Sequence, residues 1–244
     1  MIKNLNKEKL LKGGDREMKK FTSLFSAGII LSTMVGGGLT AFADEPQAPA
    51  DTQTTPVTAT LELPTDGGTN PSVPEDPSGE DNTNNNSNKA FAIAYQPTKF
   101  SFGSTALNES GEQIIPANHT KPLRVGVKDK RRLNEEWTLS ASLEWTGDNS
   151  NQMAGTTIRV QNAEVKKNVE GKVTGSANPD GVTGESSFTL SKVATTVMSA
   201  DATQRNDVYD DKLTNVDLVI PNAGNVSAGI YNGTVTWTLE SAPK

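Results

Sequence analysis

The sequence contains no cysteine and a single histidine, His119, among its 244 residues. The absence of cysteine excludes disulfide bonds, cysteine-ligated zinc, a thiol nucleophile and a lipid-modified N-terminal cysteine. One histidine excludes metal sites built from several histidines of one chain. His119 lies in a turn-like stretch, and no motif pairs it with a serine or an aspartate. We therefore expect no catalytic residue, no cofactor and no metal site.

Positive charge is not in excess after residue 43. Residues 44–89 hold one Lys or Arg against nine Asp or Glu, and residues 90–244 hold fifteen against seventeen. Proteins that bind nucleic acid usually carry a basic domain or stripe. No segment beyond residue 43 is basic overall, so we do not expect nucleic acid to be a partner.

A long uncharged run lies near the N-terminus, from Phe21 to Ala43, directly after Lys19 and Lys20. It ends in the small residues Ala41 and Ala43, at the two positions that a signal peptidase reads. This order of a basic start, an apolar middle and an A-x-A end is typical of a secretory signal peptide. We expect residues 18–43 to be this signal and the mature protein to begin at Asp44. We expect no membrane span in the mature form.

Residues 1–17 precede that signal and do not fit it. Lys12-Gly13-Gly14-Asp15 can be encoded by a stretch that contains a bacterial ribosome-binding sequence, a short distance before Met18. We therefore interpret residues 1–17 as translated leader sequence and Met18 as the true start.

Residues 44–89 contain no aromatic residue and seven of the thirteen prolines. They end in the polar run 81–88. Low hydrophobicity and high negative charge leave too little apolar surface to offset the entropy of the chain. The composition predicts an acidic, disordered linker over residues 44–89 and a folded domain over residues 90–244.

The domain shows apolar residues at every second position, which is the period of a β-strand and not of a helix. In residues 137–145 five apolar residues alternate with four polar ones. The same alternation occurs at 100–102, 123–127, 158–160, 188–190, 216–220 and 231–239. Clusters of turn-forming residues such as 147–150 and 178–181 separate these runs. The pattern predicts an all-β domain, either a β-sandwich or a partly closed barrel.

Two tripeptides repeat within this domain: Trp137-Thr138-Leu139 and Trp237-Thr238-Leu239. The second follows Tyr231-Asn232-Gly233 close to the C-terminus, and Phe100-Ser101-Phe102-Gly103 lies upstream of both. The two copies, at these places and behind a signal peptide, resemble the WxL domain of secreted proteins from Gram-positive bacteria. The resemblance covers about residues 90–244.

This resemblance implies a cell-surface protein without catalytic activity that binds the cell wall non-covalently through peptidoglycan. It also implies that partner wall proteins from the same gene clusters occur with it. One alternative is a subunit that is attached mainly through another wall-anchored surface protein. Another is a secreted hydrolase of a wall polymer, which would need an acid/base pair or a metal that the scattered carboxylates do not suggest.

The candidate binding residues are the two W-x-L motifs, one further tryptophan and an adjacent basic cluster. They are Trp137, Thr138, Leu139, Trp145, Trp237, Thr238, Leu239, Lys130, Arg131 and Arg132.

Each of these groups has two readings. Indole faces stack on sugar rings, but an apolar strand face more often packs in a core. We expect Trp237 to be buried. Trp137 opens its strand, so it is either buried or partly exposed beside Arg131 and Arg132. Trp145, at a strand end beside a turn, is the candidate for an exposed indole. The basic cluster either meets wall phosphates or carboxylates or is a solvated loop.

Overall fold

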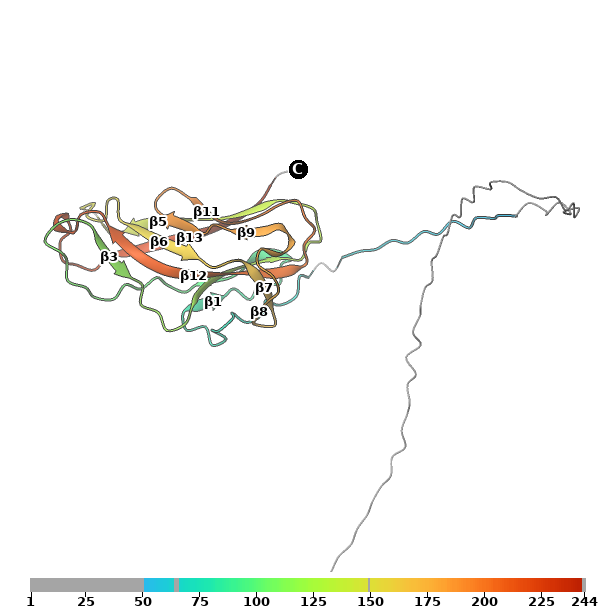
Figure 1. Ribbon diagram of the computed structural model, residues 1–244, viewed down its shortest axis with the longest axis horizontal. Coiled ribbons are helices and arrows are strands. Elements are labelled where there is room, and N and C mark those ends of the chain that lie inside the picture. The colour runs from blue at the N-terminus through green and yellow to red at the C-terminus, as the bar shows by residue number, and fades with distance from the viewer. Residues whose placement is uncertain (1–50, 64–65, 149, 243–244) are drawn as a thin grey trace, which may run out of the picture. The chain divides into compact units, whose positions relative to one another are not determined.

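The computed structural model describes residues 51–63, 66–148 and 150–242. Figure 1 shows two layers of antiparallel strands, which we call sheet A and sheet B. The sheets are not closed into a barrel, and the described residues contain two short 3-10 helices and no α-helix. The prediction of an all-β sandwich is confirmed.

Sheet A has nine strands and sheet B has four. The strands of sheet A are β1 (Asn82–Asn84), β2 (Phe91–Pro97), β3 (Gln113–Pro116), β4 (Leu123–Asp129), β6 (Thr157–Asn162), β7 (Lys166–Val169), β8 (Lys172–Thr174), β10 (Ser187–Leu190) and β12 (Asp207–Ile220). The strands of sheet B, in spatial order, are β13 (Asn232–Ser241), β5 (Trp137–Thr146), β11 (Thr195–Ala200) and β9 (Val182–Gly184). The 3-10 helices are η1 (Pro179–Gly181) and η2 (Ala223–Asn225).

The main core lies between the two sheets. The alternating residues of β5 face inward, and four of them, Trp137, Leu139, Ala141 and Leu143, are buried. They meet inward residues of sheet A that include Val125, Val127, Ile158 and Val160. The residues that alternate with period two in the sequence therefore predict correctly which side chains face the interior of the sandwich.

Sheet A is also buried on part of its outer face. All seven residues of β4 are buried, which requires cover on both sides. A second, smaller core of Val73, Ala94, Tyr95 and Val208 provides this cover. The ring of Tyr95 lies so close to Gly126 that a Cβ there would come within 2.4 Å of a ring carbon. Only glycine fits at that position of β4.

The cover comes from residues 66–89, which we call the N-terminal cover and which the composition predicts to be part of the linker. The structure differs from that expectation, because these residues contain β1 and fold onto sheet A. Residues 51–63 are all exposed and form no helix or strand, as expected of a linker. The folded part of the chain therefore begins near Asp66 and not at Ala90.

Hydrogen bonds to buried polar groups, and not apolar contacts alone, hold the N-terminal cover. Asp76 is fully buried and accepts from the backbone N–H groups of Glu80, Asp81 and Asn82 at 2.9–3.0 Å and from the Asn82 side chain at 2.9 Å. Burial alone would raise the pKa of Asp76, but these donors hold it below its usual value. Asn82 in turn accepts from the N–H of Arg124 on β4 at 2.7 Å. Composition alone indicates that such polar residues are solvated. It therefore predicts a start of the folded domain that lies too far along the chain.

Two other expectations concern segments outside strands. Residues 100–102, expected as a strand, belong to an irregular stretch between β2 and β3. The leader at 1–17 and the signal peptide at 18–43 lie outside the described residues. No helix in the part of the chain that the structure describes is long and apolar enough to cross a membrane.

The Asp76 hydrogen bonds lead to a prediction about stability. Asp76→Ala leaves several buried donors without a partner, at a cost of about 1–3 kcal/mol for each group that water cannot reach. We expect a lower melting temperature and faster proteolysis of residues 66–89. Asp51→Ala, which changes an exposed aspartate, is the matched control and should leave both unchanged. If Asp76→Ala melts like the parent protein, the N-terminal cover does not contribute to the fold as described.

Candidate functional site

A groove of about 990 Å³ opens along β13 at the end of the sandwich where this strand begins. We call it the aromatic groove. Its walls come from β5 and β13, from the stretch that precedes β3, and from the segment that joins η2 to β13. Its apolar and aromatic lining includes Phe100, Phe102, Leu107, Leu143, Trp145, Val226, Ile230, Tyr231, Val235 and Trp237.

Hydrogen bonds fix the orientation of two aromatic side chains in the groove. The indole N–H of Trp145 donates to the carbonyl of Thr156 at 3.1 Å. The hydroxyl of Tyr231 donates to the carbonyl of Ser227 at 2.8 Å and lies 3.2 Å from Oε1 of Gln152. Trp145, the candidate exposed indole, is half-buried. These rings are therefore held in place before any ligand arrives.

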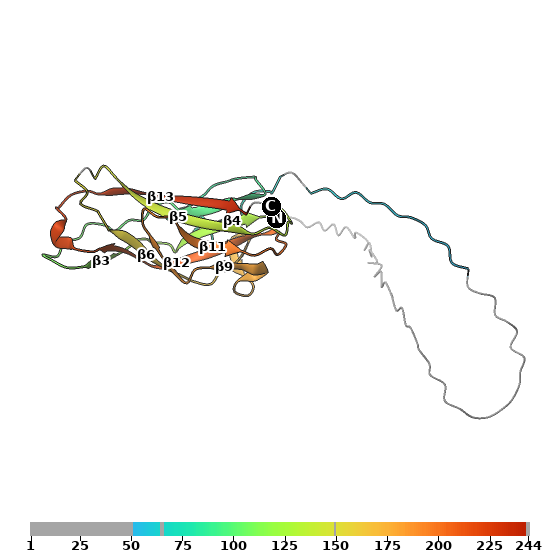
Figure 2. The ribbon, with the colours of Figure 1, turned by 90° about the horizontal axis from the view of Figure 1, so that it is seen from above.

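Trp237 is half-buried and lines the same groove. Its side chain makes no hydrogen bond to any described residue. The sequence predicts a buried Trp237, because this residue lies mid-strand between Val235 and Leu239. That expectation is wrong because β13 is the edge strand of sheet B, with a neighbour on one side only. Figure 2 shows β13 at the margin of the sheet, next to β5.

Trp137 is the buried tryptophan, with 1% of its surface exposed. It lies on β5, between β13 and β11, and its ring packs against Phe91 with centroids 6.4 Å apart. Its indole N–H has no hydrogen-bond partner among the described residues. Of the two expectations left open for Trp137, the structure supports core packing.

The two W-x-L motifs are neighbours in sheet B. Strands β5 and β13 run antiparallel, and the register places Leu139 directly opposite Leu239. The threonines Thr138 and Thr238 point to the exposed outer face. The repeat in the sequence therefore becomes one cross-strand leucine pair, with a tryptophan to either side. The motifs form part of the core and one wall of the aromatic groove.

The predicted basic cluster does not form a free cationic surface. Arg131 is held by ion pairs to Asp129 at 2.9 Å and Glu135 at 3.0 Å, and by a hydrogen bond to Ser241 at 3.0 Å. Its guanidinium also stacks 3.7 Å above the ring of Phe91. Lys130 is half-buried, and only Arg132 is well exposed. These contacts give Arg131 a structural role, and they do not leave its guanidinium available for a wall phosphate.

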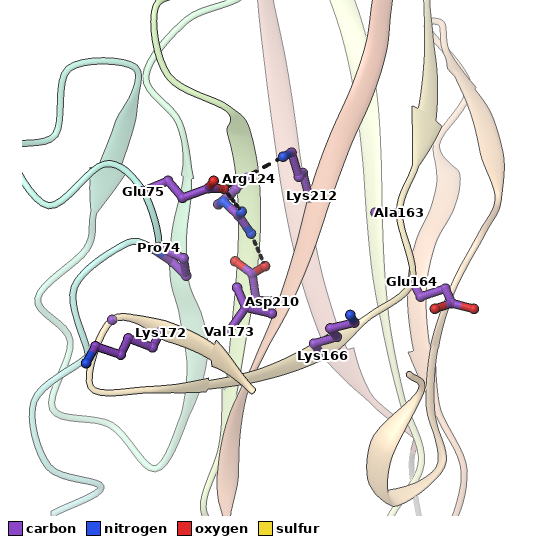
Figure 3. A pocket seen from close by; sticks show the side chains of 11 residues that line it. Pro74, Glu75, Arg124, Ala163, Glu164, Lys166, Lys172, Val173, Asp210 and Lys212 are labelled. Atoms are coloured by element: carbon purple, nitrogen blue, oxygen red, sulfur yellow. Dashed lines mark hydrogen bonds and ion pairs between the residues drawn. The ribbon is translucent and has the colours of Figure 1, made fainter. Parts of the chain in front are cut away.

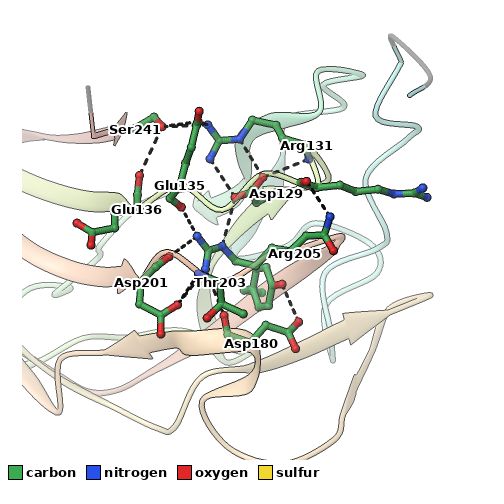
Figure 4. Close-up of polar contacts among 12 residues, drawn as sticks. Asp129, Arg131, Glu135, Glu136, Asp180, Asp201, Thr203, Arg205 and Ser241 are labelled. Atoms are coloured by element: carbon green, nitrogen blue, oxygen red, sulfur yellow. Dashed lines mark hydrogen bonds and ion pairs between the residues drawn. The ribbon is translucent and has the colours of Figure 1, made fainter. Parts of the chain in front are cut away.

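Arg205, which the sequence analysis missed, completes this arrangement. Its buried guanidinium lies within 3.4 Å of Asp129 and donates to backbone carbonyls of Glu135, Asp180 and Asp201. Figure 4 shows Arg131 and Arg205 on either side of Asp129. We call these contacts the arginine network. No local pattern around Arg205 distinguishes it from a surface arginine.

A second cavity, of about 600 Å³, lies on the outer side of sheet A (Figure 3). Four of its seven charged lining residues pair with one another, whereas Glu164, Lys166 and Lys172 form no ion pair with a described residue. Arg124 forms ion pairs with Glu75 and Asp210, and Lys212 lies 3.7 Å from Glu75. The hydrogen bond from Arg124 holds the pKa of Glu75 below its usual value. The paired groups cancel in formal charge, so the charged groups left for a ligand are Glu164, Lys166 and Lys172.

Asp211 is a strongly perturbed carboxyl group of the described domain. It is fully buried on β12, where the Asn162 amide donates to Oδ2 at 2.9 Å and Oδ1 has no partner among the described residues. Burial and the adjacent Asp210 charge raise its pKa to about 8. It does not line either cavity, so it affects stability and not ligand contact.

The remaining sequence candidates lie apart from the groove. His119 is exposed, with Nδ1 2.8 Å from the carbonyl of Lys121. The described part of the chain holds no group of three His, Asp or Glu residues arranged to bind a metal. The expected cleavage residues Ala41, Ala43 and Asp44 lie outside the described residues.

Comparison with known proteins identifies one family. The family model described as "WxL domain surface cell wall-binding" matches residues 48–243. No curated protein and no solved structure matches the chain. The matched range includes the N-terminal cover, in agreement with its place in the fold.

The different burial of the two tryptophans predicts different costs of truncation. Trp137→Ala should destabilise the domain by about 3–5 kcal/mol, because it leaves a cavity in the core. Trp237→Ala should cost less than half as much, since part of its ring already contacts water. Chemical denaturation of both variants measures the difference, and equal costs would contradict the assigned burial.

Asp211 predicts a pH dependence. The folded protein keeps a proton on Asp211 up to a pH of about 8, whereas an unfolded chain releases it near pH 4. The free energy of unfolding should therefore fall as the pH rises through this range. Asp211→Asn should reduce this decline, although Asp210, whose pKa burial also raises, still contributes to it, and should melt above the parent protein at pH 8. Glu144→Gln, which changes an exposed carboxylate, should keep the parent profile; a parent profile in Asp211→Asn would contradict the assignment.

Proposed function

The chain belongs to the WxL domain family of surface cell wall-binding proteins, and we propose that it binds peptidoglycan directly, through the aromatic groove. The observation that carries this proposal is the convergence of Trp145, Tyr231 and Trp237 on one open groove. The flat apolar face of an aromatic ring packs against the C–H face of a sugar ring. Rings held in advance lose little entropy when a glycan binds.

The size and rim of the groove also suit a glycan. Its volume of about 990 Å³ is at the upper end of the range for small-ligand sites, about 300–1,000 Å³. Hydroxyl and amide groups that can bind sugar hydroxyls line it beside the aromatic rings. They include Ser101, Ser104, Thr105, Ser227, Asn232 and Thr234.

The residues that line the groove favour binding of a glycan without its hydrolysis. No Asp, Glu or His is among the residues that line the groove. Cleavage of a glycosidic bond usually needs two carboxyl groups on either side of the bond. We therefore propose a non-enzymatic, non-covalent wall-binding role. We further propose that the chain reaches the cell surface by export, with cleavage after Ala43.

Cosedimentation with purified peptidoglycan, stripped of protein and of secondary polymers, tests the proposal. The parent protein should pellet without lowering the turbidity of the suspension. Trp237→Thr should weaken binding at least about tenfold, because it removes one stacking face while keeping a residue suited to a strand. Ile230→Asp adds charge at a groove position that is 92% exposed, so it should weaken binding without affecting the fold.

Thr236→Val is the matched control, since Thr236 lies on the outer face of β13 and should not contact the glycan. Loss of binding in both groove variants, with the control unchanged, supports the groove. Parent protein that pellets only with walls retaining their proteins would show attachment through a partner instead. Release of soluble fragments would show hydrolysis.

A further inference from the structure

The outer edge of β13 has no partner strand among the described residues. β13 pairs with β5 along all ten of its residues without a bulge. The N–H of Leu143 donates to Ser191, on the far side of β5 from β13. In an antiparallel ladder this means that Val235, opposite Leu143, directs its N–H and C=O away from β5. The same holds for Trp237 and Leu239, at every second position.

This edge lacks the features that normally protect a sheet margin. Natural edge strands are short, bulged, or carry lysine or proline, because unpaired backbone groups otherwise recruit another strand. β13 is ten residues long and contains neither lysine nor proline. The aromatic groove runs beside its first half, so a strand added there would find an apolar surface for its side chains.

A segment of the same chain repeats the sequence of β13. Val57-Thr58-Ala59-Thr60-Leu61-Glu62 matches Val235-Thr236-Trp237-Thr238-Leu239-Glu240 at five of six positions. It alternates apolar and polar residues as a strand does, yet Val57 is 90% exposed and Leu61 93%. Leu63 continues the alternation. We call residues 57–63 the donor segment.

We propose that the donor segment of one copy adds as an antiparallel strand to the outer edge of β13 in a second copy. With Ala59 opposite Trp237, the smallest donor side chain meets the largest acceptor side chain. Leu61 then lies opposite Val235, and Leu63 lies opposite Gly233, where no side chain competes for the groove. Each pair at these outward positions exchanges two backbone hydrogen bonds.

Polar and proline residues fit this register as well. Thr58 and Thr60 face Thr238 and Thr236 on the outer face, where threonine pairs are favourable. Pro56 precedes the donor segment at a position whose N–H would point away from β13, so its missing N–H costs no bond. A parallel alignment of the matching sequences would instead place Glu62 beside Glu240.

The register requires a second copy. The chain joins the domain at Gly67, which packs against Ala90, next to Phe91. Phe91 contacts Trp137, which lies opposite Ser241, so Gly67 is at the end of the sandwich where β13 finishes. Gly233 lies eight residues away, about 26 Å along the strand. The four residues from Leu63 to Gly67 span at most about 14 Å, too little to reach it.

Each copy carries one donor and one acceptor, so the contact is heterologous and joins molecules head to tail. The inference uses the edge amides of β13 and does not require that the groove bind glycan. Its tests therefore use the mature chain, residues 44–244, in solution without any wall material, and a negative result leaves the wall-binding proposal unaffected.

Proline substitutions in the exposed donor segment test the register. In sedimentation equilibrium the parent chain should self-associate as its concentration rises. Ala59→Pro removes an N–H that points at β13 and should raise the dissociation constant at least about tenfold. Thr60→Pro, one residue away, removes an N–H that points outward and should associate like the parent. A monomeric parent, or equal effects of both prolines, would overturn the proposal.

Disulfide trapping tests orientation, since the chain has no cysteine of its own. Thr60→Cys in one copy and Thr236→Cys in another should cross-link, because such opposite residues lie about 4.5 Å apart at Cα, within disulfide range. Thr58→Cys with Thr236→Cys should not. Efficient linkage of the second pair would show a parallel arrangement, and no linkage of the first would refute the antiparallel one.

Discussion

Sheet B ends at β13, a strand that hydrogen-bonds to β5 on one side only, and the candidate functional surface follows from this constraint. An edge strand cannot bury its inward side chains as fully as its neighbour, so Trp237 stays half-buried while Trp137 on β5 is enclosed. The space beside Trp237 is the aromatic groove. One unpaired edge thus leaves both an aromatic wall and a row of free backbone groups on the same side of the molecule.

Two polar clusters fix segments of the chain against the two sheets. At the end of β13 the arginine network joins Ser241 through Arg131 to Asp129 on β4. On the outer side of sheet A, Asp76 accepts four hydrogen bonds from residues of the N-terminal cover. Buried charges of this kind contribute little net stability when paired, but losing one partner is costly. They therefore hold particular segments in register more than they strengthen the core.

The sequence predicted what depends on local periodicity and missed what depends on position in the sheet. Alternation in 137–145 and 231–239 identified β5 and β13 and the sandwich that they belong to. It could not tell a central strand from an edge strand, so it misjudged the burial of Trp237. The polar composition of residues 66–89 indicated solvation, because the hydrogen bonds of Asp76 are made only once the segment is folded. The structural role of Arg131 could not be predicted either. Two of its partners, Phe91 and Ser241, lie far from it in the sequence, and no motif marks Glu135 as a third.

The central claim is that the surface beside β13 contacts the wall polymer. Amide hydrogen exchange of the full chain, with and without soluble peptidoglycan fragments, tests it most directly, because it locates contacts without altering any residue. The account predicts slower exchange, on adding fragments, in residues 98–107 and 226–239, and unchanged exchange at the cavity around Arg124 and Lys166. Protection confined to that second cavity, or to the loop that holds Arg132, would contradict it.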